Sequence, residues 1–393
     1  MKQLTLLLLF IGLFNCAQAQ LKSENYIQRY GHLSNAMHQL KKQKTLHVAF
    51  LGGSITHMQG WRDMVCNYIK ETYPEAEITC LDAGIPSLGS LPHAFRFQRD
   101  VLEKGPVDLL FIESAVNDKA NGTPSQTQRR ALEGIIRHAQ QANPRLDMVL
   151  MAFVDPEKME DYRDGKVPQE VKNHDDLAKH YNIPLINLAK EVTDRIDAGE
   201  FTWEEDFKDL HPSPFGQQLY FHTIKTLLEE EAKTVSDQLV KKPLPQPLDP
   251  ENYTTGNYLS VSQAKKLLGF TLTQNWQPSD SASTREGFVH VPVLESSTPG
   301  SSFVLDFKGP VIGMAITSGP DAGVVEYTID GKAYPPIDLY TQWSHMLHLP
   351  WYKLLADNLE SGQHRLEVKL APASAANRSS ALRVVYFLVN ARQ

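Results

Sequence analysis

Short apolar runs alternate with amphipathic stretches along the first part of the chain, and this alternation predicts an α/β domain. Strand-length apolar runs that end at turn residues occupy 46–51, 78–81, 107–112, 148–153 and 184–188. The stretches with helical spacing of apolar residues are 61–72, 91–102, 128–141, 169–181 and 214–233. Buried strands separated by such crossovers indicate a three-layer fold, with a parallel sheet between two layers of helices. We expect this domain to span 45–235, with its ligands beyond the carboxyl ends of the strands.

The pattern changes after residue 235. Residues 236–252 are rich in proline and predict a stiff linker. Beyond it, apolar runs of strand character lie at 302–307, 311–316, 324–329 and 383–389, and Asp330-Gly331 has the chemistry of a hairpin turn. Few helical patterns remain, so 253–393 is predicted to be an all-β sandwich or jelly roll.

The first residues have the pattern of a targeting segment. Lys2 precedes an apolar run at 4–14, and Ala17-Gln18-Ala19 matches the small residues that signal peptidase cleaves. We therefore expect a signal peptide at 1–19, a helical lead-in at 20–44, and export to the periplasm or the extracellular space. Lipid attachment at Cys16 is a less favoured alternative, because Asn15 is a poor neighbour for it.

Composition and charge limit the partners and the location that the chain can have. The chain has 393 residues, 39 Lys+Arg against 46 Asp+Glu and a formal net charge of −7, which argues against nucleic acid as the main partner. No run after the targeting segment reaches the ~20 apolar residues of a membrane span. The remaining cysteines, Cys66 and Cys80, are compatible either with a disulfide in an oxidising compartment or with two buried thiols. The oligomeric state stays open.

Chemistry-bearing residues follow the predicted strands. Ser54 comes directly after the first strand and two glycines, where its hydroxyl and backbone N–H can face a cleft; a plain turn is the alternative. Asn117 follows the third strand, where its amide can donate to a developing negative charge or cap a helix. His211, on a proline-flanked loop with Asp209 and Asp206 upstream, suits a general base or a surface position.

Together these segments resemble the SGNH hydrolases, also called the GDSL esterase/lipase family, over residues 46–235. Gly52-Gly53-Ser54-Ile55-Thr56 stands where the family has Gly-Asp-Ser, a variant associated with carbohydrate-esterase-like branches, and Ala115-Val116-Asn117-Asp118 matches Gly-x-Asn-Asp. The family's Asp-x-x-His would require an acid at Lys208, so the acid is expected at Asp209, with Asp206 as the alternative. The oxyanion glycine should fall within 82–90, and Gly89 is favoured over Ser87 as the backbone donor.

The resemblance implies a flavodoxin-like domain and an acyl-ester hydrolase that needs no cofactor and no metal. Ser54 would be the nucleophile, His211 the base and Asp209 the acid, while the Ser54 N–H, the Gly89 N–H and the Asn117 amide would bind the oxyanion. Histidines elsewhere, such as His345 and His348, have no cysteine or carboxylate beside them in sequence that suggests a metal site.

The expected substrate is an acylated oligo- or polysaccharide from which the enzyme removes O-acetyl groups. A lipase, lysophospholipase or thioesterase on the same fold, a non-catalytic glycan-binding protein, and acyl transfer between sugars are the alternatives. The aromatic residues of the second domain can either face sugar rings or build its core; they are Trp276, Tyr340, Trp343, Trp351 and Tyr352. The segment 285–288 is a candidate loop over the acyl site.

Overall fold

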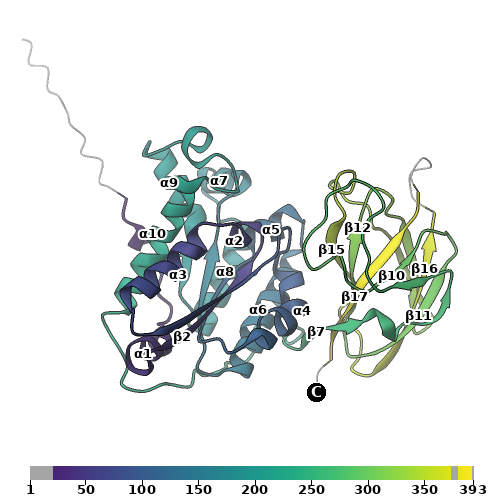
Figure 1. Cartoon of the computed structure of the whole chain (residues 1–393), viewed down its shortest axis with the longest axis horizontal. Coiled ribbons are helices and arrows are strands. Elements are labelled where there is room, and N and C mark those ends of the chain that lie inside the picture. Colours follow the sequence, from purple (N-terminus) through teal and green to yellow (C-terminus); the bar gives the residue numbers. More distant parts are fainter. Residues whose placement is uncertain (1–20, 373–378, 392–393) are drawn as a thin grey trace, which may run out of the picture.

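The computed structural model describes residues 21–372 and 379–391. An α/β domain and an all-β domain lie side by side, as Figure 1 shows. The predicted signal peptide and Cys16 fall outside the described residues. Within the described ranges, no helix combines the length and the apolar character needed to cross a bilayer.

The first domain is built on a six-stranded sheet of order β1-β6-β5-β4-β2-β3. The strands are β1 (Ile27–Gln28), β2 (Thr45–Gly52), β3 (Glu77–Gly84), β4 (Leu109–Glu113), β5 (Asp147–Ala152) and β6 (Leu185–Asn187). All neighbours pair in parallel except β1, which runs antiparallel to β6. The predicted three-layer α/β fold is therefore confirmed.

Helices cover both faces of this sheet. They are α1 (Ser34–His38), α2 (Ser54–His57), α3 (Trp61–Thr72), α4 (Ser90–Asp100), α5 (Ala115–Ala120), α6 (Ser125–Ala142), α7 (Pro156–Arg163), α8 (Gln169–Tyr181), α9 (Leu188–Asp197) and α10 (Pro214–Glu231). Side chains of β2 alternate between two cores: Val48 and Phe50 pack with α3, α9 and α10, whereas Ala49 and Leu51 pack with α4, α6 and α8. This alternation is the period of two that a strand imposes.

Short elements complete the domain. The lead-in at 20–44 was predicted to be helical, and it contains η1 (Ser23–Tyr26), α1 and η2 (Gln39–Gln43) but also the edge strand β1. Two further single turns are η3 (Leu102–Lys104) and η4 (Trp203–Phe207). The strand predicted at 184–188 ends at Asn187, because the Asn187 side chain accepts the Lys190 N–H and caps α9.

The second domain consists of two antiparallel sheets, of order β15-β12-β17-β10-β9, with β7 also on β17, and β14-β13-β16-β11-β8. Its strands are β7 (Gly256–Ser260), β8 (Lys265–Leu268), β9 (Thr271–Thr273), β10 (Val293–Ser296), β11 (Ser302–Lys308), β12 (Ile312–Ser318), β13 (Val324–Ile329), β14 (Lys332–Asp338), β15 (Leu349–Ala356), β16 (Gln363–Ala371) and β17 (Leu382–Asn390), with the turn η5 (Val261–Gln263). The turn residues Asp330 and Gly331 both have positive φ, at 52° and 78°, as a tight hairpin requires. The predicted β-sandwich is confirmed.

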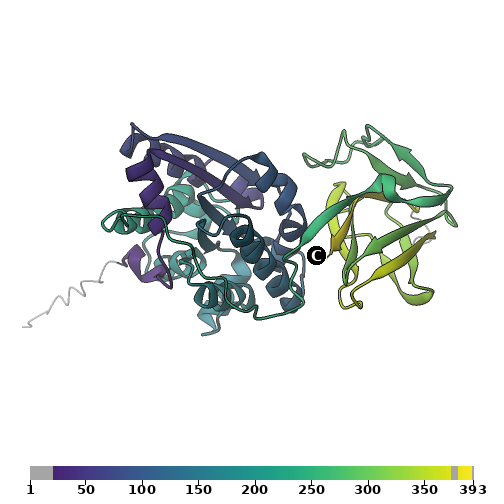
Figure 2. The same cartoon turned by 90° about the horizontal axis from the view of Figure 1, so that it is seen from below.

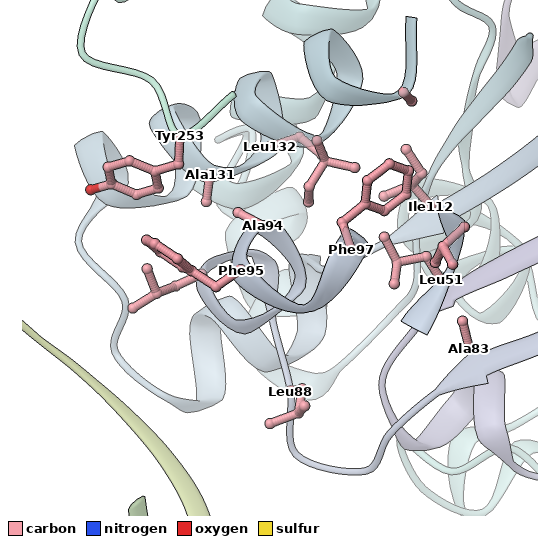
Figure 3. Packing of buried hydrophobic residues seen from close by; sticks show 14 of the residues in the cluster. Leu51, Ala83, Leu88, Ala94, Phe95, Phe97, Ile112, Ala131, Leu132 and Tyr253 are labelled. Atoms are coloured by element: carbon pink, nitrogen blue, oxygen red, sulfur yellow. The ribbon is translucent and has the colours of Figure 1, made fainter. Parts of the chain in front are cut away.

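One apolar core runs through both domains. Tyr253, Phe288 and Tyr352 of the second half belong to the same buried cluster as α4 and α6. Figure 3 shows Tyr253 beside Phe95 and Ala131, and the Phe95 and Tyr253 ring centroids are 5.4 Å apart. A Cβ at Gly134 would lie 2.6 Å from the Tyr253 carbonyl carbon, so only glycine allows this approach.

Polar contacts reinforce the interface between the domains. The buried Arg130 donates to Asp249 at 2.8 Å and to Asp357 at 2.9 Å. The connector itself lies against the first domain, where the Lys242 N–H donates to the Pro144 carbonyl and the Leu248 and Asp249 N–H groups donate to Glu133. Figure 2 shows the same side-by-side arrangement from below.

A disulfide joins Cys66 of α3 to Cys80 of β3, closing a loop of sequence separation 14. The structure therefore has the disulfide and not the two buried thiols that the sequence also allowed.

Candidate active site

Ser54 begins α2, and Gly53 alone separates it from the end of β2. Gly52 pairs with Gly84 at the carboxyl ends of β2 and β3. A Cβ at Gly84 would lie 2.5 Å from the His57 backbone nitrogen, so the glycine lets α2 pack closely over β3. This places the half-buried Ser54 at the edge of the sheet where ligands of parallel folds bind.

His211 reaches Ser54 across 157 residues of sequence, and its Nε2 lies 2.8 Å from the Ser54 Oγ. The loop that carries His211 is fixed on both sides. The buried Phe207 precedes it, and its carbonyl accepts the Ser213 N–H. On the other side, Ser213 caps α10, which has proline at its first position. The imidazole thus stands on a constrained loop at hydrogen-bond distance from the hydroxyl.

The two candidate acids occupy different environments. Asp209 Oδ1 lies 3.5 Å from His211 Nδ1 and also accepts the His211 backbone N–H at 2.5 Å. Asp206 instead accepts the Thr202 N–H at 2.8 Å and the Thr202 hydroxyl at 3.2 Å. Of the two carboxylates, only that of Asp209 has a recorded contact with the imidazole, although its side chain is 65% exposed.

Asn117 lies in the first turn of α5, directly beyond β4. Its Nδ2 stands 2.0 Å from where a Cβ at Gly53 would be, so any larger residue at 53 would displace the amide. The same Cβ would lie 3.3 Å from the Leu88 carbonyl oxygen. The residue before Ser54, the turn after β3 and the Asn117 amide therefore converge at one point.

The turn after β3 contains both predicted backbone donors. Ser87 has φ of +74°, the left-handed conformation that glycine adopts most readily. Gly89 is extended, with φ of −106°, and precedes α4. A Cβ at Gly89 would meet Asp118 Oδ1 at 2.5 Å, so this glycine is required for close packing against α5.

Ionisable groups are buried beneath α5. Burial raises the pKa of Glu113 to about 7, opposed mainly by Lys158. Burial also raises the pKa of Asp118 to about 7, opposed mainly by hydrogen bonds from Ser90. Lys158, itself fully buried, donates to the Ala115 carbonyl at 3.0 Å and pairs with Asp155. These groups support the helix that carries Asn117.

Sequence reasoning missed Arg96, which ties the two strand ends together. Its guanidinium is fully buried and donates to the Gly52 carbonyl at 3.3 Å and to the Ala83 carbonyl at 2.5 Å. A charged residue within the apolar stripe of a helix was the feature that could have identified it. Likewise, no motif indicated that Nδ1 of His57, the last residue of α2, lies 3.4 Å from Asp82 Oδ2.

Among the described residues, no group of three or more metal-binding side chains is present. His348 is buried and pairs with Asp280 at 3.0 Å, while His345 contacts the Gln342 carbonyl. The aromatic residues divide between the two roles considered: Trp276 and Tyr352 are buried, whereas Trp343 is 45% exposed.

The α/β domain has a counterpart among known protein families. The sequence pattern of the GDSL-like lipase/acylhydrolase family matches residues 50–219, from β2 through the His211 loop into α10. The α/β domain belongs to this family. The domain is therefore that of a hydrolase, and its substrates are esters.

Two solved structures resemble the whole chain. Both are of a two-domain esterase (CEX) active on acetylated mannans, one of them co-crystallized with mannopentaose. The co-crystal is 24% identical, with a TM-score of 0.77, over 95% of this chain and 99% of that chain. The other is 24% identical, with a TM-score of 0.78, over 95% and 100%. No curated protein matches. The two-domain architecture is thus shared across the full length.

Proposed function

We propose that this protein is an exported serine esterase that removes O-acetyl groups from a polysaccharide. The observation that carries this proposal is the 2.8 Å contact between Ser54 Oγ and His211 Nε2, beside the converging Asn117 amide. A hydroxyl within hydrogen-bond reach of an oriented imidazole is the requirement for nucleophilic catalysis.

In the first half of the reaction, Ser54 Oγ attacks the ester carbonyl carbon while His211 Nε2 takes its proton. Asp209 holds the imidazole through Nδ1 and stabilises its cationic form. The negative charge on the former carbonyl oxygen is bound by the Ser54 N–H, the Asn117 amide and a backbone N–H of the 87–89 turn. Gly89 is the favoured residue for that last donor, with Ser87 as the alternative.

Collapse of the tetrahedral intermediate breaks the bond to the sugar oxygen, and His211 returns the proton to that oxygen. The sugar leaves with a free hydroxyl and the acetyl group remains on Ser54. Water then attacks the acetyl carbonyl, His211 takes its proton, and acetate leaves as Ser54 regains the proton. Each oxyanion donor typically contributes about 2.7–4 kcal/mol to lowering the barrier.

Cavities between the domains support a carbohydrate substrate. One of about 440 Å³ lies beside α2 and is lined by His57, Asp82 and Lys104 of the first domain and by Glu286 and Gly287 of the second. The loop predicted at 285–288 thus contributes to its wall. Carboxylates and an ammonium group can hydrogen-bond the hydroxyls of a sugar ring.

A second cavity, of about 210 Å³, brings Ser87 and Asn121 together with Trp351 and Lys353 of β15. The half-buried Trp351 offers a flat apolar face, and the Lys353 Nζ lies 4.9 Å from its ring centroid. A polymer bound in these cavities would therefore contact both domains. The neighbouring esterase of the same architecture acts on acetylated mannans, which makes mannan the first polymer to test.

Export is supported by the disulfide between Cys66 and Cys80, since such bonds persist mainly in oxidising compartments. The targeting pattern of residues 1–19 points the same way.

A series of nitrophenyl esters of increasing chain length tests the proposal, together with acetylated mannan and acetylated xylan. We expect hydrolysis to be highest with acetate, and acetate to be released from at least one polysaccharide. The Ser54→Ala variant should lose both activities. A maximum at eight carbons or more would favour the lipase alternative, and turnover that survives Ser54→Ala would refute the mechanism.

A further inference from the structure

A buried carboxylate joins the two elements that would supply the oxyanion donors. Asp118 lies on α5, next to Asn117, and its Oδ1 accepts both the Ser90 N–H and the Ser90 hydroxyl at 2.9 Å. Ser90 begins α4, directly after the turn that contains Ser87 and Gly89. Asp118 is 1% exposed and Ser90 fully buried, so water does not compete for these hydrogen bonds.

A second hydrogen bond from the end of α5 holds the same turn. The Asn121 side-chain amide donates to the Ser87 carbonyl oxygen at 2.9 Å. The turn is therefore attached to α5 near Ser87 by Asn121 and at its end by Asp118. A Cβ at Gly89 would lie 2.5 Å from Asp118 Oδ1, so only glycine lets the turn approach α5 this closely.

This attachment matters because one oxygen atom must receive donors from both elements. Oxyanion donors act at about 2.7–3.1 Å from that atom, and a displacement of about 1 Å can cost on the order of 100-fold in rate. We propose that Asp118 is a positioning residue that sets the separation between the Asn117 amide and the N–H groups of the 87–89 turn. This inference rests on the proposed esterase function.

The role requires an acceptor at Oδ1 rather than a charge. Asp118 Oδ2 has no hydrogen-bond partner within the part of the chain that the structure describes. Asparagine would keep the Oδ1 acceptor in the same shape. Glu113, the other carboxylate buried under α5, instead accepts the Val116 N–H of its own segment at 3.2 Å and makes no recorded hydrogen bond to the turn.

The test compares Asp118→Ala, Ser90→Ala and Asp118→Asn by steady-state kinetics on nitrophenyl acetate. We expect Asp118→Ala to lower kcat by about 10- to 100-fold with KM within about twofold, because the donors act mainly on the transition state. Ser90→Ala, which removes only the hydroxyl bond, should lower kcat less. Asp118→Asn should restore kcat to within about threefold of wild type.

Ser23→Ala is the matched control, because the Ser23 hydroxyl donates to the buried Glu191 at 2.7 Å on another side of the domain. It removes the same kind of bond and should lower the melting temperature without changing kcat. If Asp118→Ala does not fold, Ser90→Ala replaces it in the comparison, and its kcat should also be lower than that of wild type.

A double-mutant cycle separates positioning from general stability. In an Asn117→Ala background the spacing to the missing amide no longer matters, so Asp118→Ala or Ser90→Ala should reduce kcat by less than about threefold. Equal reductions in both backgrounds would overturn the positioning role, as would an Asp118→Asn variant as slow as Asp118→Ala. Full turnover in Ser54→Ala would instead overturn the esterase mechanism and this inference with it.

Discussion

Asp209→Asn replaces the carboxylate of the proposed triad acid by an amide, which removes the negative charge and keeps the shape of the side chain. Asp209→Asn keeps the side-chain oxygen that accepts the His211 backbone N–H, so the loop retains its conformation. What is lost is the negative charge 3.5 Å from the imidazole Nδ1. Asp206→Asn is the matched control, because that carboxylate bonds Thr202 and has no recorded contact with the ring.

The magnitude follows from Coulomb's law and from exposure. At a separation of 3.5 Å, two unit charges interact by about 1.2 kcal/mol in water and about 5 kcal/mol at an effective dielectric constant of about 20. Because the Asp209 side chain is 65% exposed, the lower part of this range applies. We therefore expect kcat to fall by about 10- to 100-fold, well short of the ~10⁴-fold loss known for a buried triad acid.

The assay is the steady-state hydrolysis of nitrophenyl acetate across pH 5 to 9, with circular dichroism to confirm folding. Asp206→Asn should keep kcat within about threefold of wild type, because it loses only a charge-assisted bond to its own turn. A larger loss in Asp206→Asn than in Asp209→Asn would refute the assignment of Asp209. A loss of ~10⁴-fold in Asp209→Asn would refute the role given to solvent exposure.

Three further predictions concern substrate, covalent structure and pH. Glu286→Gln should lower kcat/KM on acetylated mannan several-fold more than on nitrophenyl acetate, because Glu286 lines the cavity beside α2; equal losses on both substrates would exclude a sugar-binding role. Cys66→Ala should lower the free energy of unfolding by about 3 kcal/mol, because the unfolded chain regains the conformational entropy that a disulfide loop of this length removes. Urea titration with and without reductant measures this difference, and a variant as stable as the oxidised protein would contradict it. Burial raises the pKa of Asp118 to about 7 from its ordinary value of 3.8, so the contribution of its protonated form to folding stability is fully present below about pH 4 and is lost as pH rises through 7. Asp118→Asn should remove that loss, so its melting temperature should fall less than that of wild type between pH 5 and 8. If the melting temperatures of the two proteins depend on pH in the same way, the Asp118 carboxyl does not titrate in this range.

The α/β domain was largely predictable because its elements are long and strongly patterned. The boundaries expected for 61–72 and 169–181 are those of α3 and α8, and 324–329 is β13. Strand β1 has only two residues, too few to show a period, and is formed by pairing with β6. Strand β14 contains Pro335 and Pro336 and was not recognised, yet it lies at the edge of its sheet, where proline is tolerated.

The candidate site was predictable in its reactive groups but not in its supports. Ser54 and Asn117 follow strand ends, and His211 lies on a loop between the last strand of this domain and its final helix, so their convergence could be expected from the topology of a parallel sheet. The contacts of Asp209 and Asp206 depend on the π turn at Trp203–Phe207 and on the positive φ of Lys208, which have no sequence pattern. The links from Arg96 and Asp118 join segments whose proximity exists only after folding.

The apolar core that crosses from α4 and α6 into the second domain has a consequence for recombination. A chimera that exchanges the β-sandwich alone would bring a foreign surface against Gly134, where the backbone of Tyr253 fits with no space for another atom. Cutting the chain at the connector would leave Phe95 and Tyr352 uncovered, one on each fragment. The two halves therefore form one packed unit, and any grafted module must include the residues from Asp249 to Tyr253 that bind the first domain.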